Sequence, residues 1–312
     1  SSGVVVTGST ITTAATGNDY NTITYCDVRD GATTPTNGIY SRGLTTGTNN
    51  NTLISYNNIY NFFRDSTGID SYGIYITTGS NDITIDNNSL YQTVTRTLSC
   101  ACIASGTAAG TLAIATSTSS GYGFTITNNY IGGSAPQAGG TAWTVTSNNA
   151  TLSYYVFQGI RMLTSLTGAT STIEGNTIKN INITTTSAAS NQGGIIVTLA
   201  NVNINNNTIG DPAASGSSPS IVFNNGGIAA EFNAIRTGSS TGTSGAMSIT
   251  NNTIAGIVIN PLSNGVGTTD FFGINFGTNV GGTSNIASSN TIGSSTVANS
   301  IVNSTAKEMT GI

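Results

Sequence analysis

The chain has 312 residues, with 8 Lys+Arg against 12 Asp+Glu, a net charge of −4 and no His. Charged residues make up only 6% of it, against about 25% in an ordinary soluble domain. The shortage of Lys and Arg argues against a nucleic-acid-binding face, which needs cations to neutralise phosphates. The absence of His excludes Ser-His-Asp and Cys-His hydrolysis and His-ligated zinc. No segment approaches the run of about 20 apolar residues that a membrane-spanning helix needs.

One short phrase recurs from one end of the chain to the other: an apolar residue, two spacers, Asn, one spacer, then Ile or Leu. The full copies are ISYNNI at 54–59, IDNNSL at 85–90, ITNNYI at 126–131, IEGNTI at 173–178, INNNTI at 204–209 and ITNNTI at 249–254. Two weaker copies are ITYCDV at 23–28 and ASSNTI at 287–292. The phrase is constant while the length between copies varies, which is typical of a repeat protein.

A second phrase, Gly-Ile followed by a strand-like run, precedes most copies of the first. It begins at Gly38, Gly73, Gly159, Gly194, Gly227 and Gly273, and Cys102-Ile103 is expected to replace it in the third copy. Ordered runs rich in β-branched residues, without a helical period, predict an all-β chain. Each repeat is predicted to contain a strand, a turn, a strand, a tight corner, a strand and a variable loop. The segments 104–122, 132–150, 211–224 and 236–246 are predicted to be loops.

The asparagine of the first phrase is predicted to form a tight corner, because Asn tolerates a positive φ better than most residues. If the corners stack, each Asn side chain can bond to the corners above and below and satisfy buried backbone groups. The aligned copies place Cys26 at this position in the first repeat. The remaining members of the column are Asn57, Asn88, Asn129, Asn176, Asn207, Asn252 and Asn290.

With these two phrases, the chain resembles the right-handed parallel β-helix proteins, whose architecture occurs in pectate lyases, polygalacturonases, phage tailspikes and many bacterial surface proteins. The resemblance covers nearly all of residues 1–312 and implies a single-stranded, right-handed solenoid of about eight coils. It also implies that the asparagine column above is the internal asparagine ladder of such proteins. The fold hosts several unrelated functions, so the resemblance is less specific for activity.

The domain organisation follows from the repeat, which continues after every variable segment. We therefore expect residues 1–312 to form one solenoid domain. The chain begins SSGVVV and ends at the Gly311-Ile312 dipeptide that opens a coil. Since a solenoid normally needs caps on its end cores, we expect a segment of a longer polypeptide or a subunit of an assembly.

Catalytic residues are not evident in the sequence. Charge concentrates in the first hundred residues, where Asp82 and Asp86 flank one predicted strand, but the next coils have Thr127 and Glu174 at the position of Asp86. Carbohydrate cleavage needs a set of converging carboxylates, so the chain is expected not to be an enzyme. Calcium would also need an acidic cluster, and the sequence shows no clear one. Neither a cofactor nor a metal site is predicted.

Aromatic residues suggest a binding surface instead. Tyr60 and Tyr91 follow equivalent anchors, and strand alternation would turn both side chains outward, one coil apart. Stacked exposed tyrosines can bind sugar rings or pack against another protein. We predict a glycan-binding strip formed by Tyr60, Tyr91, Arg64 and Asp65, with a purely stabilising ladder of rings as the alternative.

The prediction for function is an extracellular structural or adhesive β-helix, a segment of a cell-surface protein or a subunit of a surface filament. A nearly uncharged surface offers little repulsion against association, so self-association is expected and a polysaccharide is a candidate partner. The alternative is a polysaccharide lyase, hydrolase or tailspike-like depolymerase using Asp65, Asp70, Asp82 or Asp86. Threonine pairs at Thr22/Thr24 and Thr125/Thr127 fit the pattern of an ice-binding face only locally.

Overall fold

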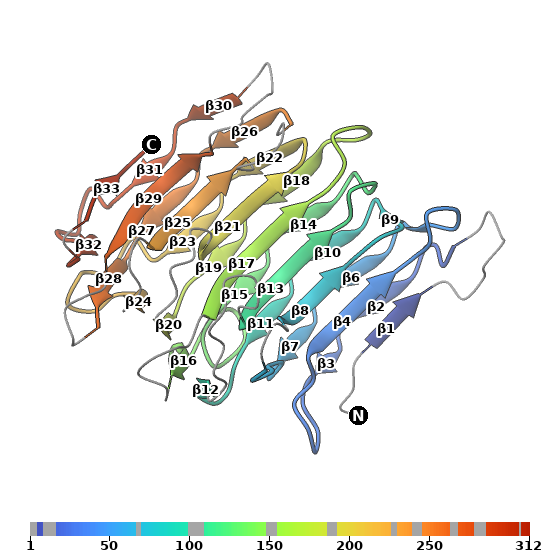
Figure 1. Cartoon of the computed structure of the whole chain (residues 1–312), viewed down its shortest axis with the longest axis horizontal. Helices are drawn as coiled ribbons and strands as arrows, with labels where there is room; N and C mark the ends of the chain where they lie inside the picture. The colour runs from blue at the N-terminus through green and yellow to red at the C-terminus, as the bar shows by residue number, and fades with distance from the viewer. Residues whose placement is uncertain are drawn as a thin grey trace.

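The computed structural model describes residues 5–8, 17–66, 70–98, 109–147, 155–185, 192–225, 230–238, 245–262, 268–277, 285–305 and 307–312. In these ranges every regular element is a β-strand. The named strands pair in parallel and form stacked sheets (Figure 1). The predicted all-β chain with parallel strands is therefore confirmed.

Four sheets contain nearly all of the named strands, and within each sheet the strands lie side by side in chain order. Sheet 1 consists of β1 (Val5–Gly8), β4 (Asn37–Arg42), β8 (Ser71–Ile76), β13 (Ala109–Ser117), β17 (Tyr155–Leu163), β21 (Gln192–Leu199), β25 (Ala230–Thr237), β29 (Thr269–Phe276) and β33 (Met309–Thr310). Sheet 2 consists of β2 (Thr22–Thr24), β6 (Leu53–Ser55), β10 (Thr84–Asp86), β14 (Thr125–Thr127), β18 (Ser171–Glu174), β22 (Val202–Asn205), β26 (Met247–Thr250) and β30 (Asn285–Ser288).

Sheet 3 consists of β3 (Asp27–Val28), β7 (Asn58–Tyr60), β11 (Ser89–Tyr91), β15 (Tyr130–Ile131), β19 (Thr177–Ile178), β23 (Thr208–Gly210), β27 (Thr253–Ala255) and β31 (Thr291–Ile292). Sheet 4 consists of β12 (Arg96–Leu98), β16 (Trp143–Ser147), β20 (Ile181–Thr185), β24 (Ile221–Asn225), β28 (Ile257–Pro261) and β32 (Ile301–Asn303). The short strands β5 (Asn49–Asn50) and β9 (Ser80–Asn81) pair with each other.

The chain visits the sheets in a recurring order, and one passage from sheet 2 to sheet 1 is one repeat. The first two repeats pass through sheets 2 and 3 to sheet 1, and from β10 onward each repeat passes through sheets 2, 3 and 4 to sheet 1. After β10, β11, β12 and β13, for example, β14 returns to sheet 2 beside β10. Each strand thus pairs with its equivalents in the repeats before and after it. Figure 1 shows the strands following one another from the blue N-terminal end to the red C-terminal end.

The register of sheets 2 and 3 comes from the apolar anchors of the repeated phrase. Ile54 pairs with Ile85 in sheet 2, and Ile59 pairs with Leu90 in sheet 3, as the sequence predicts. These side chains are fully buried, because alternate residues of a strand face opposite sides of a sheet. One continuous apolar core results, and Trp143 adds edge-on ring contacts within it.

The asparagine column forms hydrogen bonds from repeat to repeat. Each Nδ2 donates to the Oδ1 of the next asparagine at 2.9–3.0 Å, from Asn57 through to Asn290. The same Oδ1 accepts the backbone N–H of the preceding column residue at 2.9–3.0 Å. At the start of the column, the Cys26 N–H donates to Asn57 Oδ1. The predicted stacking of the column is confirmed.

The positive φ of the corner belongs to a different residue from the one predicted. It lies one position before each column residue, with φ between 53° and 66° at Tyr25, Tyr56, Asn87, Asn128, Gly175, Asn206, Asn251 and Ser289. The column asparagines themselves are not among the positive-φ residues. Several corners read Asn-Asn. The first residue of the pair is left-handed and turns the chain, and the side chain of the second points inward and bonds to the next column asparagine.

Two predictions about the positions of strands also need correction. Cys102-Ile103 and Gly227-Ile228 lie outside the described residues, and Ala113-Ile114 and Ala234-Ile235 occupy the Gly-Ile register in those repeats. Segments predicted to be loops contain β13, β16 and β24. Alanine takes the place of glycine in these two repeats, so the Gly-Ile phrase does not mark their strands. The strands of sheet 4 were not predicted because they are short and follow loops of variable length.

Candidate ligand-binding surface

The predicted strip on sheet 3 is only partly a surface. The rings of Tyr60 and Tyr91 stack with their centroids 4.7 Å apart and their planes at 8°, but the Tyr91 side chain is only 6% exposed. The next position in sheet 3 is Gly132, and the Gln92 N–H donates to Gly133 O at 3.3 Å. The backbone of the following repeat therefore lies next to Tyr91. Burial raises the pKa of Tyr91 most, and the nearby Tyr60 and Asp27 raise it further, to about 12.

Arg64 and Asp65 are exposed and follow β7 in the chain. The Arg64 backbone N–H donates to Ser71 Oγ at 2.7 Å, beside sheet 1. The cation over the Tyr60 ring is Arg29, whose guanidinium carbon lies 6.0 Å from the ring centroid. The structure thus brings Arg29, rather than Arg64, to the predicted strip, while glycan binding there stays a prediction.

A second group of tyrosines, which the sequence reasoning missed, lies at the corners of sheet 2. Tyr25 and Tyr56 stack with centroids 5.2 Å apart and planes at 9°, and they are 78% and 49% exposed. Tyr20, before β2 at the opposite end of that strand, is also 78% exposed. We call Tyr20, Tyr25 and Tyr56 the corner tyrosines. For Tyr25 and Tyr56, the sequence signal was their place one residue before the ladder column, where most other repeats have Asn.

The backbone of every corner tyrosine is left-handed, with φ of 58°, 55° and 55°. For a bulky L-residue this conformation costs roughly 1–2 kcal/mol, and it is a genuine outlier. The corner of Tyr25 and Tyr56 is built from Asn128, Asn206 and Asn251 elsewhere, so the fold does not require tyrosine there. Strain of this kind is concentrated at functional sites, which makes the corner tyrosines the strongest candidates for a functional role.

The strain predicts that the double variant Tyr25→Asn/Tyr56→Asn is more stable than the wild type. Two strained corners are relieved, while one exposed ring stack worth about 1 kcal/mol is lost. The expected net rise in the free energy of unfolding is about 1 kcal/mol, measured by urea denaturation. A fall of similar size would instead show that the rings are there for stability.

A third aromatic group lies on sheet 1. The rings of Tyr72 and Tyr75 stack with their centroids 3.9 Å apart. The centroid of the Tyr40 ring lies 5.7 Å from that of Tyr75. The Tyr72 hydroxyl donates to Asp70 Oδ2 at 3.2 Å. Burial raises the pKa of Asp70, and the Tyr72 hydrogen bond and the charge of Arg161 oppose it only in part. Asp70 is thus a carboxyl group that retains its proton to a higher pH than an exposed one.

The raised pKa of Asp70 predicts a pH-dependent contribution to stability. The folded state binds this proton more tightly than the unfolded chain does. The carboxyl group therefore stabilises the fold fully below its unfolded pKa, and the stabilisation is lost as pH rises through the higher folded-state pKa. Asp70→Asn has no proton to lose, so its free energy of unfolding relative to wild type is expected to rise between pH 3 and pH 7. Denaturation at both pH values measures this, and an unchanged difference would contradict it.

Of the other carboxylates proposed for catalysis, Asp82 and Asp86 lie at sheet 2. Asp86 lies on sheet 2 and accepts hydrogen bonds from Thr127 Oγ1, Asn128 Nδ2 and Asn87 Nδ2 at 2.7–3.0 Å. Burial raises the pKa of Asp82, which precedes β10. Asp70, by contrast, precedes β8 of sheet 1. The structure thus places Asp70 and Asp86 at different sheets.

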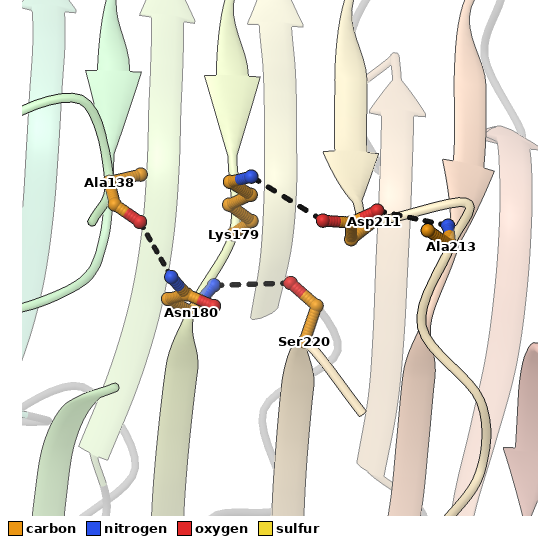
Figure 2. Close-up of polar contacts among 6 residues, drawn as sticks. All are labelled: Ala138, Lys179, Asn180, Asp211, Ala213 and Ser220. Carbon is orange, nitrogen blue, oxygen red and sulfur yellow. Dashed lines mark hydrogen bonds and ion pairs between the residues drawn. The ribbon is translucent and has the colours of Figure 1, made fainter. Parts of the chain in front are cut away.

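Figure 2 shows the polar contacts around Lys179 and Asp211. Asp211 and Asn180 also help to line a hollow of about 320 Å³. Lys179 Nζ lies 3.4 Å from Asp211 Oδ2, and the Ala213 N–H donates to Asp211 Oδ1. Asn180 donates from Nδ2 to Ala138 O and from its backbone N–H to Ser220 Oγ. The Ala213 bond is local to its loop, and the other contacts join neighbouring repeats, so a structural role accounts for them.

Two further observations concern other kinds of site. In the described part of the chain, no cluster of three or more Cys, Asp or Glu side chains is placed to ligate a metal ion. Within the same residues, the search for a helix of membrane-spanning length and hydropathy finds none.

Comparison with protein-family models, curated proteins and solved structures finds no match to this chain.

Proposed function

We propose that the chain is a right-handed parallel β-helix, a solenoid in which each repeat forms one coil. The recurring order of the sheets, the parallel register and the stacked asparagines support this architecture. Neighbouring coils would then contact only one another. Such a rod holds side chains from successive repeats at the regular spacing of paired strands, about 4.8 Å.

The function we propose is structural and adhesive, at the cell surface or outside the cell. The chain would act as a segment of a surface protein or as a subunit of a surface filament. The observation that carries this proposal is the stack of Tyr25 and Tyr56, two exposed rings on strained backbone that the fold does not need. A pair of stacked, exposed rings on a rigid scaffold is a candidate interaction surface. The low charge of the chain also favours association.

Beads coated with the purified protein test adhesion directly. They are expected to adhere to cell walls or extracellular matrix preparations, and beads coated with Tyr25→Asn/Tyr56→Asn are expected to adhere much less. Antibody labelling of intact cells that make the protein tests its location, with electron microscopy to distinguish filaments from stalks. Labelling only after the cells are broken open, or equal adhesion by the variant, would contradict the proposal.

A carbohydrate-cleaving activity is the second candidate, and one observation favours it. Asp70 has a raised pKa and lies within hydrogen-bonding distance of Tyr72, and a carboxyl group that retains its proton suits a general acid. Release of soluble sugars from polysaccharides, with and without calcium, tests this. Turnover that Asp70→Asn abolishes would favour an enzyme, and no turnover on any polymer would eliminate this candidate.

A further inference from the structure

The corner tyrosines border a strand face whose dimensions suit an extended ligand. Tyr20 and Tyr25 stand at the two ends of β2, five residues apart, which corresponds to roughly 16 Å of extended chain. Thr22 pairs with Leu53 and Thr24 with Ser55 between those ends. Thr22 and Leu53 are both exposed. The face therefore has an aromatic ring at one end, a ring stack at the other, and hydroxyl and apolar groups between them.

The chemistry of this face fits sugar rings. A pyranose has an apolar C–H face and a hydroxyl rim, and a tyrosine has an apolar ring with a polar tip. Rings held at both ends would contact separate units of one chain, and the hydroxyl of Thr22 can bond to units between them. An extended polymer satisfies both ends at once, as a single small molecule would not.

The charges around the face distinguish between classes of polymer. Residues 17–28 and 49–60 contain no Lys or Arg, and Asp19 and Asp27 lie close to the corner tyrosines in sequence. Arg29, which follows this segment, lies over the Tyr60 ring of sheet 3, so these two segments offer an anionic polymer carboxylates and no cation. Asp19 Oδ1 accepts the Asn50 N–H at 2.7 Å and Asp27 Oδ1 accepts from Asn58 Nδ2 at 2.8 Å. Asp19 lies before β2 and Asp27 lies in β3, so β2 and β6 themselves carry no charged residue. The uncharged rings and hydroxyls of this face therefore suit a neutral polymer.

We propose that the face of β2 and β6, between Tyr20 and the Tyr25–Tyr56 stack, binds a neutral polysaccharide chain. This inference rests on the proposed adhesive function and identifies its ligand. It locates binding on sheet 2 rather than at Tyr60 and Tyr91 on sheet 3.

Affinity electrophoresis against hydroxyethyl cellulose, polygalacturonate and chitosan, with calorimetry on gluco-oligosaccharides of increasing length, tests the proposal. Wild-type protein is expected to bind the neutral polymer, with an affinity that rises with oligosaccharide length to a plateau. Tyr25→Asn/Tyr56→Asn is expected to weaken binding at least tenfold while folding normally, because asparagine occupies the same corner in other repeats. Tyr20→Ala is expected to shorten the oligosaccharide length at which the affinity levels off.

Tyr130→Ala serves as the matched control, since it removes a half-buried tyrosine from β15 of sheet 3 and is expected to leave binding unchanged. Tyr60→Ala tests the strip on sheet 3 as the competing site. Asn87→Tyr tests for a gain, because Asn87 follows Tyr56 in the same corner column with φ of 53°. A third ring at this position would extend the stack and strengthen binding. Loss of binding in Tyr60→Ala but not in the double variant would overturn the proposal, as would preference for chitosan or polygalacturonate.

The outcomes separate this inference from the proposed function. Beads that adhere to natural surfaces while no neutral polymer binds would overturn the inference and leave adhesion standing. Soluble polymer that binds while the beads adhere to nothing would leave the site standing and overturn the adhesive role. If the beads adhere to nothing and no neutral polymer binds, the adhesive function and the polysaccharide site are both overturned.

Discussion

Asn207→Ala is expected to lower the free energy of unfolding by about 3 kcal/mol, because it breaks the asparagine column in its middle. The Asn207 side chain is fully buried. Its Nδ2 donates to Ile173 O and Asn252 Oδ1, and its Oδ1 accepts from both nitrogens of Asn176. Truncation leaves the buried Asn176 N–H without its acceptor and opens a small void. Chemical denaturation measures the loss.

Asn203→Ala is the matched control for this prediction. Asn203 is also an asparagine of the same repeat, but it is exposed on the outer side of β22. A change at such a position is usually worth less than about 0.5 kcal/mol. If the two variants lose similar stability, the column does not act through buried hydrogen bonds.

The sequence was sufficient for the core and the column because both depend on residue identity at a fixed offset. Ile54 and Ile85 pair because each is the apolar anchor of the same phrase, and burial allows little else at that position. Asn88 and Asn129 bond because the same phrase places them at the same corner. The variable lengths between phrases do not change this pairing, since the extra residues lie outside the phrase in each repeat.

The candidate surface could not be predicted as well, because it depends on contacts between residues distant in sequence. Tyr91 looks exposed from strand alternation, but the backbone at Gly132 and Gly133 of the next repeat lies next to it. The Tyr25–Tyr56 stack was missed because the sequence does not say which residue of Tyr56-Asn57 turns the chain. Once the positive φ at Tyr25 and Tyr56 is known, a tyrosine at a position that favours asparagine indicates a role other than folding.

The strands of sheet 4 were hidden for a related reason. The Ile221–Asn225 strand has only a few alternating apolar residues and follows a loop that differs in length from those of other repeats. Its equivalents, such as Trp143–Ser147, share no motif with it. Such strands are defined by pairing with the neighbouring repeats rather than by a pattern of their own.

Gly210→Ala is expected to lower the free energy of unfolding by more than about 4 kcal/mol. Gly210 has φ of +85°, and a Cβ there would lie 1.7 Å from Ala255 O and 2.9 Å from the Ala255 carbonyl carbon. Those atoms belong to the backbone of β27, which pairs in register with β23. They cannot move aside as a flexible side chain would, so the two repeats must separate or the strands must shift.

The proposed solenoid gives this variant a local signature, because each coil is stabilised mainly by its neighbours. Hydrogen exchange in Gly210→Ala is expected to increase in β22, β23, β26 and β27, while β6, β7, β10 and β11 stay protected and the corner tyrosines keep their stack. Gly311→Ala is the control, since the nearest atom to a Cβ there is Ile292 Cδ1 at 3.8 Å, an ordinary contact. Uniform exchange along the whole chain would contradict a repeat-by-repeat architecture, and wild-type stability would contradict the register of β23 on β27.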